Sequence, residues 1–150
     1  MGNIFYPDFR DFINELNTND VKYILVGGYS VIFHGYSRST GDMDIWVKRD
    51  KENYKKLANA FTNFGMPVFN MTEDVFLNHP TWDVFTFGSP PVCIDILVKV
   101  KGLNFDDSFK MSTTFEDEGL VVRTIHINHI KAKEAAGRPR DIDDINNLTK

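Results

Sequence analysis

Segment 23–47 restricts the fold more than any other part of the chain. It begins with an apolar run, continues through two adjacent glycines and an apolar segment, and ends with Asp42 and Asp44 alternating with apolar residues. Such alternation is the period of a β-strand, in which residues i and i+2 project from the same face. The two Cα atoms should be roughly 6.5 Å apart at about 3.3 Å rise per residue. Close carboxylates repel unless a cation or a proton lies between them, and hard oxygen ligands suit Mg²⁺ or Mn²⁺, so the pattern predicts a divalent metal site.

The glycine pair, Gly27 and Gly28, ends the apolar run and opens a predicted helix over 28–35. Glycines let backbone N–H groups approach a ligand without a side chain in the way. A helix N-terminus also favours phosphate, and Ser30 offers a hydroxyl to the same ligand. Metal-binding aspartates fourteen residues after such a turn indicate chemistry on a nucleoside triphosphate.

The order of these residues resembles the signature of the DNA polymerase beta-like nucleotidyltransferase superfamily. In that superfamily a Gly-Gly or Gly-Ser turn precedes two aspartates separated by one residue, and a third aspartate lies on a later strand. The chain is most similar to a small prokaryotic branch that includes the abortive-infection (AbiEii-type) toxins, which share a His-Gly, Arg, Thr, Asp-x-Asp order. The residues that carry this order here are His34, Gly35, Arg38, Thr40, Asp42 and Asp44.

The third carboxylate that the resemblance implies is available as Asp95, in the predicted strand 92–98. The Gly-Ser-Pro-Pro turn at 88–91 pairs this strand with 82–87 as an antiparallel hairpin. Such a hairpin would carry Asp95 back beside Asp42 and Asp44. Asp83 is a rival third ligand, but Asp95 is preferred because its strand is rich in β-branched residues, as central strands are.

Basic residues near the C-terminus also resemble that branch, in which a lysine precedes a Gly-Arg-Pro-Lys-Asp-like segment. The matching residues are Lys133, Gly137, Arg138, Pro139, Arg140 and Asp141. The resemblance implies that Lys133 and Arg138 bind the triphosphate, whereas the alternative is that they complement a helix dipole and nearby acids. Arg38 and Thr40 either contact triphosphate oxygens or brace their loop against Asp42, since arginine suits phosphate and carboxylate equally.

Length and composition bound these hypotheses. A chain of 150 residues is predicted to form a single domain over 1–150. A net charge of −4 and a pI near 5.5 argue against nonspecific coating of nucleic acid. The single cysteine, Cys93, excludes an internal disulfide and is expected to be a buried bystander. There is no signal-peptide pattern and no apolar run near the roughly 20 residues of a membrane span, so the expected location is cytoplasmic.

Hydrophobic periodicity predicts an α/β (α+β) protein with a mixed and mostly antiparallel sheet flanked by helices. The resemblance implies that these elements form the minimal nucleotidyltransferase fold. An acidic turn at 116–119 is expected to be a solvated hairpin tip. The predicted helices are 7–17, 28–35, 49–64, 105–111, 128–136 and 141–148. The predicted strands are 21–26, 42–47, 68–71, 81–87, 92–98, 113–115 and 120–125.

The resemblance implies a metal-dependent nucleotidyltransferase that moves a nucleoside monophosphate from an NTP to an acceptor hydroxyl. The catalytic and metal-binding residues would be Asp42, Asp44 and Asp95. The nucleotide-binding residues would be Gly27, Gly28, Ser30, Arg38, Thr40, Lys133 and Arg138. The acceptor is open among a tRNA end, a protein and a small molecule, and Tyr29 or Trp46 is a candidate for stacking on the base. The alternatives are a catalytically inactive nucleotide-binding or regulatory module of the same fold, and a toxin neutralised by an antitoxin protein.

Overall fold

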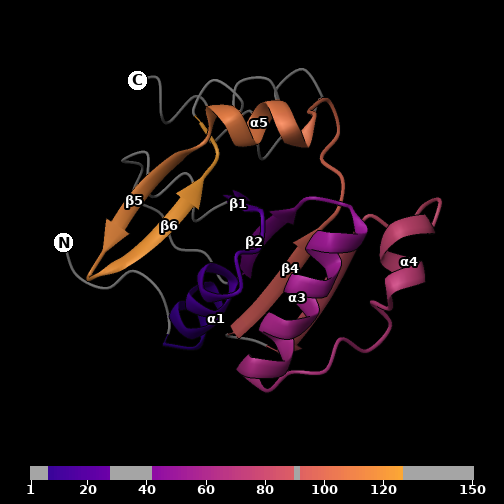
Figure 1. Ribbon diagram of the computed structural model, residues 1–150, viewed down its shortest axis with the longest axis horizontal. Helices are drawn as coiled ribbons and strands as arrows, with labels where there is room; N and C mark the ends of the chain where they lie inside the picture. Colours follow the sequence, from indigo (N-terminus) through magenta and orange to yellow (C-terminus); the bar gives the residue numbers. More distant parts are fainter. Residues whose placement is uncertain (1–6, 28–41, 90–91, 127–150) are drawn as a thin grey trace.

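A six-stranded mixed sheet forms the centre of the protein (Figure 1). The computed structural model describes residues 7–27, 42–89 and 92–126. In the order in which they lie side by side, the strands are β3 (Val84–Ser89), β4 (Val92–Leu97), β2 (Asp42–Val47), β1 (Tyr23–Val26), β6 (Leu120–Thr124) and β5 (Thr113–Asp117). The pairs β1–β2, β3–β4 and β5–β6 are antiparallel, whereas β2–β4 and β1–β6 are parallel. The predicted mixed and mostly antiparallel sheet is confirmed.

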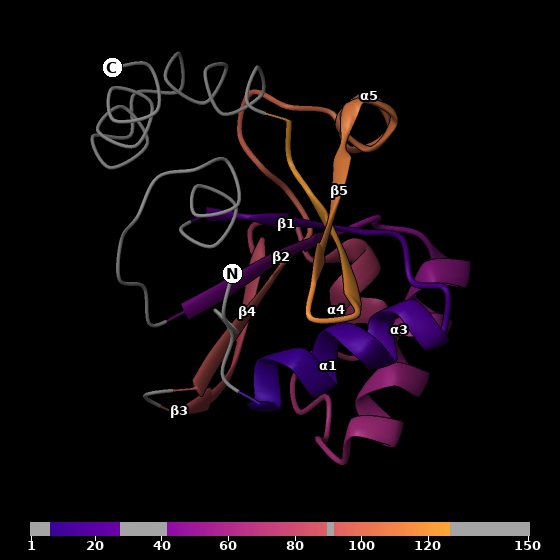
Figure 2. The same ribbon diagram turned by 90° about the vertical axis from the view of Figure 1, so that its left-hand side faces the viewer.

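Helices cover both faces of the sheet (Figure 2). The described helices are α1 (Pro7–Thr18), α3 (Lys51–Phe64), α4 (Glu73–Asn78) and α5 (Phe105–Met111). On one face α1 packs beside α3, where Phe12 meets Phe61 edge to face with ring centroids 5.4 Å apart. On the other face α5 packs over a smaller cluster that includes Trp46. The predicted helices 28–35, 128–136 and 141–148 lie outside the described residues.

The burial pattern of β1 explains its central position. All four of its residues are buried, and they alternate between the two hydrophobic clusters: Tyr23 and Leu25 belong to the larger cluster, Ile24 and Val26 to the smaller. A strand covered on both faces needs such a continuous apolar run.

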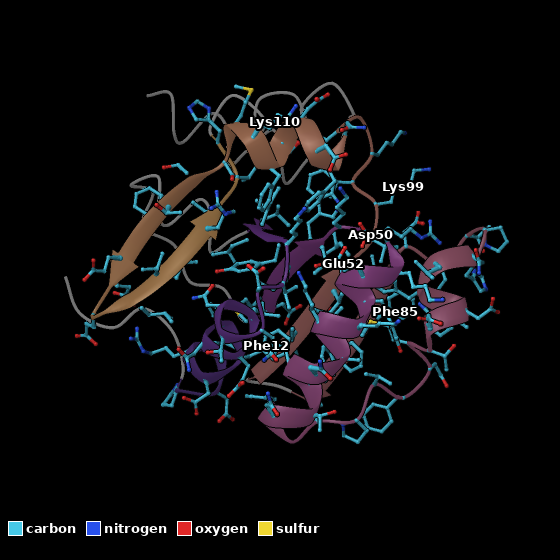
Figure 3. All side chains as sticks on the ribbon, viewed as in Figure 1. Phe12, Asp50, Glu52, Phe85, Lys99 and Lys110 are labelled. Carbon is cyan, nitrogen blue, oxygen red and sulfur yellow. The ribbon has the colours of Figure 1, made fainter. Side chains whose placement is uncertain are left out.

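Figure 3 shows Phe12 and Phe85, both members of the larger cluster, together with the exposed lysines at 99 and 110.

The bounds of α3 follow from its caps. Asp50 is the N-cap, with extended backbone, and its carboxylate accepts a hydrogen bond from the N–H of Asn53 at 2.7 Å. Gly65 ends the helix in the left-handed conformation at φ 91°, which glycine adopts without penalty. The helix therefore begins two residues later than the predicted start at position 49.

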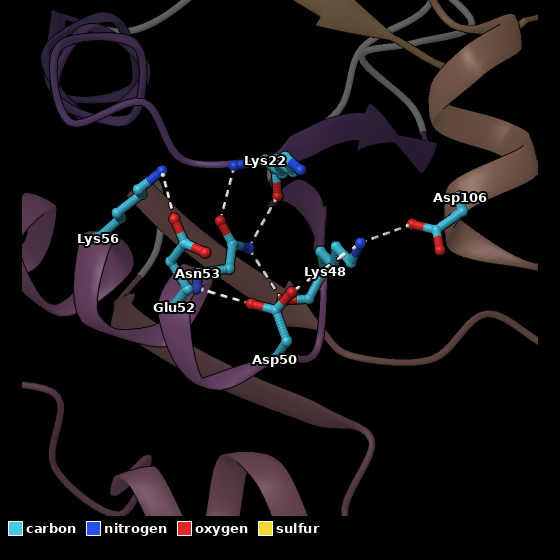
Figure 4. A network of polar contacts seen from close by, with 7 residues as sticks. All are labelled: Lys22, Lys48, Asp50, Glu52, Asn53, Lys56 and Asp106. Atoms are coloured by element: carbon cyan, nitrogen blue, oxygen red, sulfur yellow. Dashed lines mark hydrogen bonds and ion pairs between the residues drawn. The ribbon is translucent and has the colours of Figure 1, made fainter.

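Asn53 ties α3 to the ends of two strands (Figure 4). Its side-chain oxygen accepts from the N–H of Lys22 at 2.8 Å. Its amide nitrogen donates to the carbonyls of Lys22 and Lys48 at 3.1 and 2.9 Å. Asn53 is only 3% exposed, so these backbone groups, just before β1 and just after β2, are satisfied by one buried side chain.

The predicted strand 68–71 is wrong. This segment forms a turn, in which the N–H of Met71 donates to the carbonyl of Val68 at 2.9 Å and Phe69 has a left-handed φ of 49°. The short helix α4 follows and was not predicted. The sequence does contain the start signals of this helix. Thr72 is the N-cap, whose hydroxyl accepts a hydrogen bond from the N–H of Val75, and the acidic residue Glu73 lies in the first turn.

The strand predicted over 81–87 begins later, as β3 at Val84. The reason is His79, whose Nδ1 accepts hydrogen bonds from the N–H groups of Thr81 and Trp82 at 3.2 and 2.9 Å. These bonds hold the two residues in a turn and keep them out of the sheet ladder. His79 therefore organises this loop.

The acidic segment 116–119 is not simply a solvated tip. β5 extends to Asp117, which is 2% exposed and accepts a hydrogen bond from Arg10 Nη1 at 2.9 Å. Arg10 also donates to the backbone carbonyls of Asp117 and Glu118 at 3.0 and 3.1 Å. The prediction missed this pair because its two partners are more than a hundred residues apart in the chain.

Replacing Asn53 with alanine should lower the free energy of unfolding by about 2 kcal/mol, because the N–H of Lys22 loses its acceptor and the carbonyls of Lys22 and Lys48 each lose one of their donors. The better helix propensity of alanine offsets only a few tenths of this loss. Urea unfolding measures the change. Asn78→Ala is the matched control, since the side chain of that exposed helical asparagine makes a single hydrogen bond within the described part of the chain, to Asp74. Its loss should cost less than about 0.5 kcal/mol. Equal effects of both variants would contradict the role given to Asn53.

Candidate active site

The parallel pairing of β2 with β4 brings the predicted carboxylates together. Asp44 and Asp95 are direct Cα partners in this ladder, and Asp42 is the partner of Cys93. The residues between them on both strands, such as Met43 and Ile94, are buried in the larger cluster. Because side chains alternate along a strand, the three aspartates project from the opposite face.

The surroundings of the three aspartates differ. Asp42, at the start of β2, is exposed, whereas Asp44 and Asp95 are half-buried. Asp95 accepts a hydrogen bond at 2.8 Å from the hydroxyl of Thr86, its register partner on β3. Sequence reasoning missed Thr86, because nothing in the local pattern distinguishes it from any other threonine on an edge strand. Thr86, Asp95 and Asp44 therefore lie in one row across three neighbouring strands.

Asp83, the rival third ligand, does not occupy this row. It precedes β3, and its backbone carbonyl accepts a hydrogen bond from the N–H of Val98 at 2.9 Å. The register partner of Asp44 on β4 is Asp95, whereas Asp83 lies before the first paired residue of β3, Val84. The structure thus places Asp95, and not Asp83, beside Asp44.

Gly27 lies directly against Asp44. Val26 is the register partner of Asp44, and the next residue, Gly27, has a φ of 71°. A Cβ built on Gly27 would collide with Oδ2 of Asp44 and would come within 3.1 Å of its Cγ. A glycine is therefore needed here for two reasons, its left-handed backbone and the space that the Asp44 carboxylate fills.

Cys93 lies among the aspartates and is half-buried, not the fully buried residue that was expected. Burial raises the pKa of its thiol, and the negative charges of Asp42 and Asp95 and a hydrogen bond to Asp42 raise it further. A raised pKa keeps the thiol protonated at neutral pH, which argues against a nucleophilic role.

Trp46 is not available to stack on a base. It follows Asp42 and Asp44 on the same face of β2, but it is only 2% exposed. Its ring packs edge to face against Phe105 of α5, with centroids 5.2 Å apart. Tyr29, the other candidate, lies outside the described residues.

The three carboxylates have the right chemistry for a divalent cation, but their arrangement supports such a site less clearly. Three aspartates on one face supply the hard oxygen donors that Mg²⁺ or Mn²⁺ prefers. Among residues 7–27, 42–89 and 92–126, however, no group of three or more His, Cys, Asp or Glu side chains is arranged to hold a metal ion. The metal site therefore stays a prediction, supported by the donor set and by the register of β2 and β4.

The other predicted nucleotide-binding residues cannot be placed in this geometry. Gly28, Ser30, Arg38, Thr40, Lys133 and Arg138 all lie outside the described residues.

A hollow of about 350 Å³ lies elsewhere, at the opposite end of β1 from Gly27. Its lining includes Tyr23, Phe109 and Arg123. The Arg123 guanidinium is already engaged, since it lies 4.7 Å from the centre of the Phe109 ring and donates to the hydroxyl of Ser112 at 2.9 Å. This hollow is separate from the aspartates.

No helix within the described ranges is long and apolar enough to cross a membrane. No protein-family model matches the chain, and no curated protein sequence matches it.

Two solved structures are similar to the chain over almost its whole length. A candidate nucleotidyltransferase from Thermotoga maritima has a TM-score of 0.58 at 14% identity, covering 92% of this chain and 88% of its own. The lincosamide antibiotic adenylyltransferase LnuA, in a lincomycin-bound structure, has a TM-score of 0.58 at 14% identity, covering 99% of both chains. At this identity the likeness concerns the fold, and the chain therefore has the nucleotidyltransferase fold.

Proposed function

We propose that this protein is a metal-dependent nucleotidyltransferase, which moves a nucleoside monophosphate from an NTP to an acceptor hydroxyl and releases pyrophosphate. The observation that carries the proposal is the register of β2 and β4, which makes Asp44 and Asp95 neighbours on one face, with Asp42 two residues before Asp44. Carboxylates gathered on a sheet of this fold are the groups that such chemistry needs.

Each aspartate has a role in the proposed reaction. Asp42, Asp44 and Asp95 would hold Mg²⁺ or Mn²⁺, which when bound would neutralise phosphate oxygens and orient the reacting groups. Asp95 would accept the proton of the acceptor hydroxyl, whose oxygen then forms a bond to the α-phosphorus. The bond from the α-phosphorus to the bridging oxygen breaks, and pyrophosphate leaves with that oxygen.

The nucleotide would be held mainly by residues of segments 27–40 and 133–138. In the proposal Gly27, Gly28 and Ser30 bind the β- and γ-phosphates through backbone N–H groups and a hydroxyl. The remaining triphosphate contacts are assigned to four residues: Arg38, Thr40, Lys133 and Arg138.

A small-molecule hydroxyl is the acceptor to test first. LnuA is named for adenylyl transfer to a lincosamide antibiotic, and its match covers 99% of both chains. A chain of this length is therefore long enough to form that fold. A tRNA end and a protein hydroxyl follow as further acceptors. Mass spectrometry of candidate acceptors after incubation with labelled NTPs and Mg²⁺ would identify the product.

The second candidate function is a catalytically inactive nucleotide-binding or regulatory module. It is favoured by one observation, that no three metal-binding side chains converge within the described residues. Calorimetry with NTP, combined with a pyrophosphate assay, separates the two, since such a module binds nucleotide and releases no pyrophosphate.

If the protein acts as an AbiEii-like toxin, an antitoxin protein should co-purify with it.

Replacing Asp44 with asparagine should abolish Mg²⁺-dependent NTP turnover while the fold is kept, because the amide has nearly the same shape but lacks the charge. The loss should exceed the roughly 100-fold that removal of an outer-shell partner can cost. Pyrophosphate release measures it. The matched control is Asp106→Asn, which removes an exposed carboxylate that, among the described residues, pairs with Lys48 alone. Unchanged turnover in the Asp44 variant would remove the mechanism.

The fit between Gly27 and Asp44 gives a separate prediction. Gly27→Ala should lower NTP turnover about tenfold or more, since a displacement of about 1 Å in a catalytic group can cost 100-fold. Gly102→Ala is the control, because Gly102 has a similar left-handed φ of 84° but nothing within 4 Å of an added Cβ. The strained backbone should cost both variants about 1 kcal/mol of stability, and the collision with Asp44 should add to this loss in Gly27→Ala. Equal turnover in the two would show that displacement of Asp44 does not matter.

A further inference from the structure

The hydrogen bond from Thr86 to Asp95 is the starting point. Thr86 Oγ1 donates to Asp95 Oδ1 at 2.8 Å across the antiparallel pair of β3 and β4. Within the described ranges it is the one hydrogen bond that the Asp95 carboxylate makes. The length is typical of a strong O–H···O⁻ bond.

The strand order decides which side of Asp95 this bond occupies. β3 and β2 flank β4 on opposite sides, so Thr86 approaches Asp95 from the side away from Asp44. Oδ1 of Asp95, which accepts the hydrogen bond from the Thr86 hydroxyl, is therefore engaged on the β3 side. Oδ2 is left for a ligand shared with Asp44.

The bond also restricts a side chain that otherwise rotates easily. The terminal torsion of aspartate is broad, so a carboxylate without a partner samples many orientations. Threonine is β-branched and stiff at χ1, which makes its hydroxyl a well-defined anchor. Valine has the same branching as threonine and is equally common in strands, so strand formation alone does not require threonine at position 86. The hydroxyl is therefore the feature that indicates a role.

We propose that Thr86 is a positioning residue of the carboxylate site, which turns Asp95 so that its second oxygen faces the ligand held by Asp44. Thr86 does not touch the substrate in this proposal and acts only through Asp95. The inference rests on the proposed function, because it assigns Asp95 to binding a divalent cation. It adds a residue that sequence reasoning did not single out.

Three variants test this role. Thr86→Val removes the hydroxyl and keeps the shape, Thr86→Ser keeps the hydroxyl, and Thr114→Val makes the same change at an exposed position on the other edge strand, β5. The first readout is calorimetric titration with Mn²⁺ alone, which needs neither an acceptor nor turnover. The second is kcat and KM for NTP at several Mg²⁺ concentrations, and thermal unfolding checks that each variant is folded.

Thr86→Val should weaken Mn²⁺ binding and lower kcat by about 10- to 100-fold, the usual cost of losing a group that orients a metal ligand. KM for NTP should change much less, because Thr86 does not contact the nucleotide. Thr86→Ser should restore both quantities, and Thr114→Val should leave both as in the unmodified protein.

The outcomes separate this inference from the proposed function. If Asp44→Asn abolishes turnover while Thr86→Val leaves Mn²⁺ affinity and kcat unchanged, the role of Thr86 is overturned and the proposed function stands. If Thr86→Ser fails to restore what Thr86→Val removes, shape and not the hydroxyl is responsible, which also overturns it. If the unmodified protein binds no Mn²⁺, Asp95 has no cation to be oriented toward, and the inference is again overturned.

Discussion

The parallel ladder between β2 and β4 is the interaction on which the candidate site depends. It makes Asp44 and Asp95 direct partners, although they are separated by fifty-one positions in the chain. A shift of the register by one residue would turn Asp95 toward the hydrophobic core and bring Ile94 or Ile96 to the other face. The burial of those isoleucines in the larger cluster opposes such a shift. The packing of the core and the position of the carboxylates are therefore determined together.

The strands on either side of this pair complete the surroundings of the two carboxylates. Directly after β1, Gly27 leaves the space that the Asp44 carboxylate fills. On β3, Thr86 donates a hydrogen bond to Asp95. One row across β3, β4 and β2 thus combines a hydroxyl and two acids, and Gly27 follows Val26, the register partner of Asp44 on β1. Each acid therefore has a neighbour on its outer side. Both acids are half-buried, so their orientations matter more than those of solvated surface groups.

Local patterns predicted most of the elements of the fold. The alternation in β2 and the helix predicted over 7–17 each lie within a few residues, and both agree closely with the structure. The antiparallel β3–β4 hairpin is also confirmed, but Gly88 and Ser89, which were predicted to lie in its turn, belong to β3. The errors arose where a side chain competes with a regular pattern. His79 holds Thr81 and Trp82 in a turn, and a left-handed residue, Phe69, interrupts what reads as a short strand. Asp117 read as solvated because its partner, Arg10, is remote in sequence.

The amino-acid sequence by itself determined which face of β2 carries the aspartates, since strand alternation depends only on neighbouring residues. It also indicated that the glycine pair and the acids belong to one kind of site. Only the tertiary structure decided that Asp95, and not Asp83, lies beside Asp44, and that Thr86 and Gly27 contact the two acids. Strand order and register decide these contacts, and both depend on packing between segments that are far apart in the chain, which no local pattern encodes.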